Sequence, residues 1–166
     1  MAGIVVGVDG SQESRDALRW GVEDGHRRKL PVTAVHIVDP QEAPNPHRAA
    51  LGYVSDEATV RRVADDERTL REDHSVQARQ RAEARLDAII RETVPDEQSA
   101  IRRVTLEDKR PGRALVGRAR NADLLVVGSR GRGGFANLSL GSVSRYCVLH
   151  APVPVVVIRA GILSAV

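Results

Sequence analysis

Short runs of aliphatic, mostly β-branched residues recur along this chain and constrain its fold more than any other feature. They cover residues 3–9, 32–38, 123–128 and 153–158, and each is apolar at successive rather than alternating positions. Strands that are apolar on both faces are typical of a parallel sheet covered by helices on both sides. Helix-forming segments lie between the runs, so the sequence predicts an α/β fold with right-handed crossovers.

The segments between these runs carry helix signals. Ser11 is a suitable N-cap with Glu13 in the first turn, and apolar residues at helical spacing continue to about His26. Residues 100–106 alternate poorly between apolar and polar side chains, which is typical of a strand at a sheet edge. Further helices are predicted over residues 78–93, from residue 111, and over residues 140–150.

Length and composition favour one domain with a small tail. The 166 residues fit a single domain, which we place at residues 1–160, with residues 161–166 as a C-terminal tail. Residues 40–74 carry three prolines and then many charges, so we expect a loop and a weak helix there; a flexible lid and a solvated surface both remain open. Cys147 is the lone cysteine, and no run of residues is long and apolar enough for a leader or a membrane span. We therefore expect a cytoplasmic protein.

Charge and aromatic content bear on the class of ligand. The formal net charge is only +3, and aromatic residues make up 2% of the chain, which argues against a protein that stacks nucleic-acid bases. The distribution is more informative, because no Asp or Glu follows Asp123. Arginines in that stretch are Arg130, Arg132, Arg145 and Arg159. A positive C-terminal quarter suits a phosphate ligand, although a basic surface without a ligand would look the same.

The main candidate site is a glycine-rich loop after the run at residues 123–128. Gly128, Gly131, Gly133 and Gly134 fall within seven residues, at the carboxyl end of a buried strand, where open α/β sheets bind their ligands. Gly141 and Ser142 then begin a helix, whose free N–H groups and positive dipole end favour an anion. The hydroxyls of Ser142 and Ser144 are further candidate donors. This combination predicts a phosphate site, the alternative being a glycine-rich turn that only packs.

Two common phosphate motifs do not fit this loop. Gly128-x4-Gly133 begins like a Walker A loop, but Gly134-Phe135 stands where Lys-Ser/Thr is required. Gly131-x-Gly133-x-x-Ala136 imitates a dinucleotide fingerprint, but no acidic residue follows to hold a ribose.

The spacing Gly128-x2-Gly131-x9-Gly141-Ser142 resembles that of the universal stress protein (UspA) family, in its ATP-binding branch. Residues 6–11, 35–39 and 150–157 are similar to that family's first strand and turn, second strand and closing segment. The resemblance covers residues 3–40 and 110–160, with a looser fit between them. It implies a five-stranded parallel, doubly wound (Rossmann-like) sheet with helices on both faces. It also implies an ATP-binding stress-response protein that forms a homodimer through its last strand.

The same resemblance implies which residues hold ATP at the carboxyl end of the sheet. The backbone at Val38 would meet adenine, Gly7, Val8 and Asp9 would line the ribose side, and Asp9 could also hold Mg²⁺. Gly141, Ser142 and Val143 would hold the phosphate tail. The residues that would wrap ribose and phosphates are Gly128, Ser129, Arg130, Gly131, Arg132, Gly133 and Gly134. Asn137 and Ser139 depart from the family pattern, but only at spacer positions.

Little in the sequence indicates catalysis. No nucleophile with a paired base is apparent, and Asp9 and Asp39 are the only carboxylates expected near the loop, so we expect slow ATP hydrolysis at most. His36 and Cys147 are interpreted as core residues and Trp20 as packing at a helix rim. Two alternatives remain open. One is a weak Mg-dependent ATPase or phosphotransferase that uses Asp9; the other is a module that recruits a partner and has a vestigial nucleotide loop.

Overall fold

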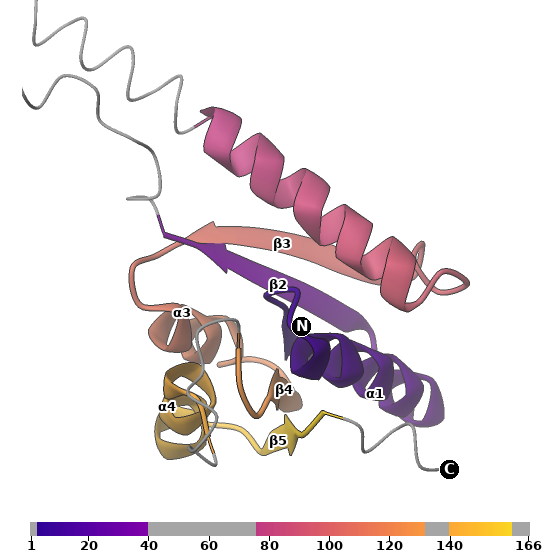
Figure 1. The fold of residues 1–166 in the computed structure, drawn as a ribbon. Coiled ribbons are helices and arrows are strands. Elements are labelled where there is room, and N and C mark those ends of the chain that lie inside the picture. Colours follow the sequence, from indigo (N-terminus) through magenta and orange to yellow (C-terminus); the bar gives the residue numbers. More distant parts are fainter. Residues whose placement is uncertain (1–2, 40–75, 132–139, 161–166) are drawn as a thin grey trace, which may run out of the picture.

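The computed structural model describes residues 3–39, 76–131 and 140–160. Its centre is a sheet of five parallel strands in the order β3-β2-β1-β4-β5 (Figure 1). The strands are β1 (Ile4–Gly7), β2 (Val32–Val38), β3 (Ile101–Glu107), β4 (Leu124–Gly128) and β5 (Val155–Ile158). This order runs outward in both directions from β1, so the doubly wound parallel sheet that the sequence predicts is confirmed.

Helices cover both faces of the sheet (Figure 1). One face carries α1 (Gln12–Arg28) and a helix whose described part is residues 76–93; the other carries α3 (Pro111–Arg118) and α4 (Ser142–His150). Residues of β1 alternate between the two apolar cores: Ile4 and Val6 pack with Leu18 of α1, whereas Val5 packs with Leu115 of α3. Because burial on both faces is complete, β1 reads as a continuous apolar run in the sequence.

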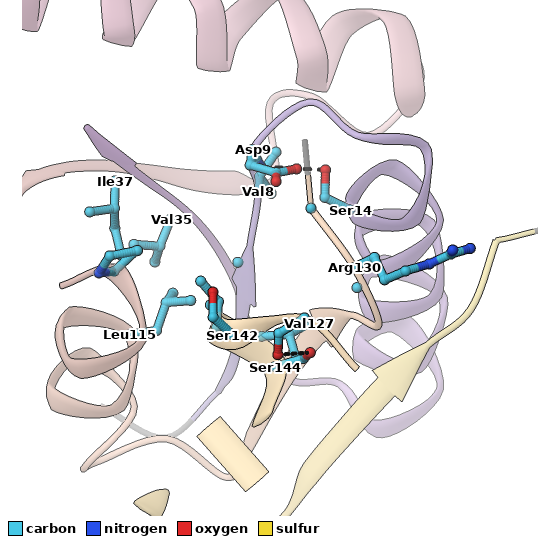
Figure 2. Close-up of a pocket in the computed structure, with 16 residues that line it drawn as sticks. Val8, Asp9, Ser14, Val35, Ile37, Leu115, Val127, Arg130, Ser142 and Ser144 are labelled. Atoms are coloured by element: carbon cyan, nitrogen blue, oxygen red, sulfur yellow. Dashed lines mark hydrogen bonds between the residues drawn. The ribbon is translucent and has the colours of Figure 1, made fainter. Parts of the chain in front are cut away.

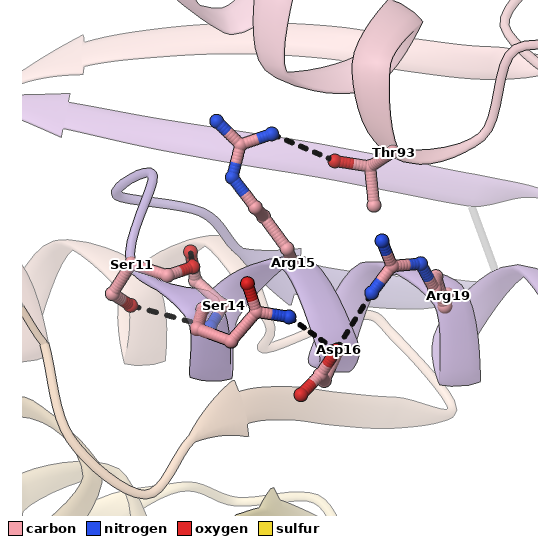
Figure 3. Close-up of polar contacts among 7 residues, drawn as sticks. Ser11, Ser14, Arg15, Asp16, Arg19 and Thr93 are labelled. Carbon is pink, nitrogen blue, oxygen red and sulfur yellow. Dashed lines mark hydrogen bonds and ion pairs between the residues drawn. The ribbon is translucent and has the colours of Figure 1, made fainter. Parts of the chain in front are cut away.

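The start of α1 follows local capping rules. Ser11 is the N-cap, with extended backbone, and its side chain accepts a hydrogen bond from the Ser14 N–H. The helix continues to Arg28, slightly beyond the predicted end, and stops at Lys29 in the left-handed conformation. Arg15 ties α1 to the neighbouring helix, because its guanidinium contacts the Thr93 hydroxyl at 3.3 Å (Figure 3).

β3 is an edge strand, as its poor alternation predicts, and β5 forms the opposite edge.

Several element boundaries differ from the predicted ones by one or two residues. α4 begins at Ser142 rather than at residue 140, because Gly141 has the extended backbone of an N-cap. β5 begins at Val155, two residues later than predicted; the Pro154 oxygen still accepts from the Leu125 N–H.

Trp20 packs against the core at the helix rim, as expected. Among the described residues, no helix is both long enough and apolar enough to cross a membrane. The loop and weak helix predicted at residues 40–74, and the tail at residues 161–166, lie outside the described residues.

Candidate functional site

A cavity of about 570 Å³ lies where the carboxyl ends of β1 and β4 meet (Figure 2). After these two neighbouring strands the chain continues into α1 on one face and α4 on the other, so the crevice between them is the topological switch point of the sheet. Ligands of open α/β sheets bind at this position, and the volume suits a ligand the size of a nucleotide.

One wall of the cavity is apolar. Val35 and Ile37 of β2, Leu115 of α3 and Val127 of β4 contribute aliphatic side chains (Figure 2). Leu115 packs directly against Gly7, because a Cβ at position 7 would come within 2.9 Å of the Leu115 Cδ1. Such a wall suits the flat, weakly polar face of a base.

Asp9 forms the polar rim at the end of β1. Its Oδ1 accepts hydrogen bonds from the Ser11 N–H at 2.9 Å and from the Ser11 hydroxyl at 2.6 Å. Its Oδ2 lies against the backbone of Gly131, since a Cβ on Gly131 would be only 2.5 Å away. Asp9 therefore shapes the turn before α1 and also lines the cavity, and a side chain at position 131 would displace its carboxylate.

The glycine-rich loop is closed at its base by backbone and hydroxyl hydrogen bonds. The Ser129 oxygen accepts from the Gly141 N–H at 2.7 Å and from the Ser144 hydroxyl at 2.8 Å. Ser144 is 2% exposed, and its hydroxyl also contacts the Gly141 oxygen at 3.0 Å. Its single proton is directed to these carbonyls, so Ser144 supports the loop while also lining the cavity.

The beginning of α4 faces the cavity without a side-chain cap. Gly141 is the N-cap and, among the described residues, no side chain provides a capping hydrogen bond to the first turn. The first helical hydrogen bond runs from the Arg145 N–H to the Gly141 oxygen, while Ser142 and Val143 line the cavity. The amides of the first turn and the positive end of the helix dipole therefore point toward the place where an anion would lie.

Arg130 lines the cavity, but its guanidinium points across α1, away from the other labelled residues (Figure 2). One of its nitrogens lies 3.4 Å from the Glu13 carboxylate, which is largely buried. The positive charge predicted at Arg130 is therefore present, but it forms an ion pair with Glu13.

Most residues predicted to bind the ligand are brought together by the fold. The predicted residues that line the cavity are Gly7, Val8, Asp9, Gly128, Arg130, Gly131, Gly141, Ser142, Val143 and the candidate donor Ser144. Val38 does not line it among the described residues, and its oxygen accepts from the Asp108 N–H. Ser129 does not line it either, because it is buried and its backbone joins β5 and the loop base. Arg132, Gly133 and Gly134, with the spacer residues Asn137 and Ser139, lie outside the described residues.

The cavity also contains residues that the sequence reading missed. They are Ser14, Val35, Ile37, Pro111, Leu115 and Val127. Val35 and Ile37 alternate with His36 along β2, and finding them requires knowing which face of this strand meets α3. Ser14 sits three residues after the N-cap, where a buried hydroxyl is unusual and points to a local polar role.

Other titratable residues are part of the core or surface. His36 is buried and its ring contacts the Val8 oxygen, as expected of a core histidine. Cys147 is fully buried, and this burial raises the pKa of its thiol to about 11. Among the described residues, no three His, Cys, Asp or Glu side chains are grouped to hold a metal ion.

Comparison with known sequences now identifies the family. The sequence model of the universal stress protein family matches residues 3–159. The chain belongs to the universal stress protein family. It is 32% identical over 161 residues to the universal stress proteins Rv2005c and Rv2623 of Mycobacterium tuberculosis, in alignments that cover 95% of this chain and 48% and 45% of those proteins. This universal stress protein thus spans about half the length of the curated relatives it matches.

Solved structures share its fold. The universal stress protein UspA from Lactobacillus plantarum has a TM-score of 0.59 and 22% identity, with 95% of this chain and 97% of that chain covered. A universal stress protein solved in complex with cAMP has a TM-score of 0.59 and 21% identity, with 96% and 98% covered. One from Archaeoglobus fulgidus, solved in complex with dAMP, has a TM-score of 0.53 and 24% identity, with 95% and 98% covered. At these identities the likeness concerns the fold.

Proposed function

We propose that this universal stress protein binds ATP in the cavity between β1 and β4 and acts in the stress response through the bound nucleotide. The observation that carries the proposal is the uncapped start of α4, at Gly141 and Ser142, next to a glycine-rich loop at a switch point of the sheet. Amides held in this way are preorganised for phosphate oxygens. The cAMP and dAMP complexes of its structural relatives agree with an adenine nucleotide.

The rest of the cavity fits the other parts of ATP. The aliphatic wall at Val35, Ile37 and Leu115 suits the base, and the Asp9 carboxylate suits hydroxyl groups of the ribose. A carboxylate and phosphate oxygens are also the ligands that Mg²⁺ prefers, so Asp9 would hold the ion together with the phosphates. The described residues offer preorganised amides for the ground state but no paired nucleophile and base, so we expect ATP hydrolysis to be slow.

The test uses the first position of α4. Proline is tolerated at the first residue of a helix, and the extended backbone of Gly141 suits a residue that precedes proline. Ser142→Pro therefore removes one amide donor and the hydroxyl with little change in fold, whereas Ser142→Ala removes only the hydroxyl. Calorimetric titration with ATP should show a loss of about tenfold or more in Ser142→Pro and a smaller loss in Ser142→Ala, as expected for charge-assisted hydrogen bonds.

Analysis of the protein as purified provides a second test. Denaturation followed by chromatography and mass spectrometry should release an adenine nucleotide. Absence of released nucleotide, together with no heat of ATP binding to the wild-type protein, would contradict the proposal. It would favour the alternative, a module that recruits a protein partner.

We also propose a homodimer that forms along β5. This strand is an edge of the described sheet, and Val155 and Val157 are only partly buried. An apolar edge of this kind is a liability unless another chain covers it. Light scattering at micromolar concentration should give twice the mass of one chain; a monomeric mass would overturn this part of the proposal.

A further inference from the structure

One peptide unit at the rim of the cavity is held from both sides by buried side chains. It joins Val8 and Asp9, which both line the cavity (Figure 2). Its carbonyl oxygen, on Val8, lies 2.7 Å from the Nδ1 of His36. Its N–H, on Asp9, donates to the hydroxyl oxygen of Ser14 at 3.3 Å. Both side chains are almost fully buried, with exposed fractions of 5% for His36 and 3% for Ser14.

The geometry fixes the role of the His36 ring. A carbonyl oxygen only accepts, so Nδ1 carries the proton and donates to Val8. β1 ends at Gly7, and the Val8 N–H still donates to the Val35 oxygen at 2.8 Å. The His36 side chain therefore supplies a donor to the Val8 oxygen just beyond the end of the strand.

His36 itself is not on the ligand side of the sheet. Side chains alternate along β2, and Val32 and Ala34 belong to the core beneath α1. His36 shares their face, whereas Val35 and Ile37, which line the cavity, lie on the opposite face. His36 therefore influences a ligand only through the backbone that it holds.

We propose that His36 is a positioning residue for the nucleotide site, because its hydrogen bond to Val8 and the Ser14 contact to Asp9 together fix the peptide from which the Asp9 carboxylate projects. The Asp9 carboxylate lies against the Gly131 backbone, where a small rotation of this peptide would move it away from a ribose or into the loop. This inference rests on the proposed ATP binding. His36, a core residue, would thus affect the affinity for ATP without contacting the nucleotide.

Two substitutions separate the hydrogen bond from the packing of the ring. His36→Phe keeps a buried ring of similar size but has no donor. His36→Asn loses ring volume but places an N–H close to the position of Nδ1. We expect calorimetric titration with ATP to show about a tenfold weaker affinity for His36→Phe, the loss of one buried hydrogen bond, and an affinity within about twofold of wild type for His36→Asn.

Stability should follow a different order. Urea unfolding should show His36→Asn to be clearly less stable than wild type, because it leaves a cavity in the core. A purely structural role would make ATP affinity follow stability in these variants. A double-mutant cycle adds a readout that global destabilisation does not move: the effect of His36→Phe on ATP affinity should shrink to about twofold or less in an Asp9→Asn background.

Each outcome decides between the hypotheses. Wild-type protein that binds no ATP overturns the proposed function and this inference together. Wild-type protein that binds ATP overturns the inference alone if His36→Phe binds equally well, if His36→Asn binds as weakly as His36→Phe, or if the effects at His36 and Asp9 are independent. Should His36→Phe not fold, His36→Leu, which also lacks a donor, replaces it with the same expected loss.

Discussion

The backbone of Gly128 lies directly against Glu13, so that a Cβ at position 128 would be 2.8 Å from the Glu13 Cβ and 2.9 Å from its carbonyl carbon. The end of β4 and the first turn of α1 thus touch through their main chains. Gly128, which the loop motif marks as a ligand residue, is also a packing residue. A substitution at position 128 should therefore change stability as well as ligand binding.

We predict that Gly128→Ala lowers the free energy of unfolding by about 1–3 kcal/mol, because the new methyl group meets backbone that cannot move aside easily. The matched control is Gly117→Ala, since a Cβ there meets nothing within 4 Å and Gly117 is in α3. That change should leave stability unaltered or raise it by up to about 1 kcal/mol. Urea unfolding of both variants checks the pair, and equal stability of the two would contradict the packing argument.

Ser144→Ala should destabilise the protein by about 1–2 kcal/mol, because a buried hydroxyl that donates to the Ser129 and Gly141 oxygens is lost. Ser142→Ala removes an exposed hydroxyl two residues earlier and should change stability by less than about 0.5 kcal/mol. Thermal unfolding followed by circular dichroism measures both. A Ser144→Ala protein as stable as wild type would mean that the loop base is held by the backbone alone.

The pair Arg130 and Glu13 offers a test of charge at the loop. Arg130→Gln should weaken ATP binding about fivefold and leave adenosine binding unchanged, because only the phosphates sense the lost charge. Glu13→Gln breaks the same ion pair but leaves the arginine, so it should bind ATP at least as well as wild type. Calorimetry with both ligands checks this. Equal losses in the two variants would show that the ion pair acts through loop structure instead.

Cys147 should make stability depend on pH in the alkaline range. Burial raises the pKa of its thiol from 9.0 to about 11, so the unfolded chain releases this proton at lower pH than the folded one. The contribution is fully present below about pH 9 and is lost as the pH rises through about 11. Urea unfolding from pH 8 to 11 should therefore show a steeper fall for wild type than for Cys147→Ala. Parallel curves, or rapid reaction of the folded protein with a thiol reagent, would refute the assignment.

Much of the fold could be predicted from the sequence, because strands buried on both faces leave continuous aliphatic runs and Ser11 is a strong local start signal. The glycine-rich loop and the start of α4 could also be predicted, because both depend on backbone conformations that favour glycine, and the glycines are evident in the sequence. The edge position of β3 followed from its weak alternation.

The rest of the site depends on three-dimensional arrangement that local patterns do not contain. The apolar wall at Val35, Ile37 and Leu115 requires knowing which face of β2 meets α3, and in a strand buried on both faces the two sets of side chains look alike. Ser129 and Ser144 have the residue type of ligand donors, but Ser129 is buried away from the cavity and the Ser144 hydroxyl contacts backbone oxygens.

Ser129 also joins two regions that were described separately. Its N–H donates to the Ile158 oxygen of β5 at 2.6 Å, and its oxygen accepts from Gly141 at the base of the loop. In the proposed homodimer, these two hydrogen bonds would connect the pairing of β5 to the base of the nucleotide loop. If the two events are coupled, the coupling must be reciprocal: nucleotide strengthens association by the same factor by which association strengthens nucleotide binding.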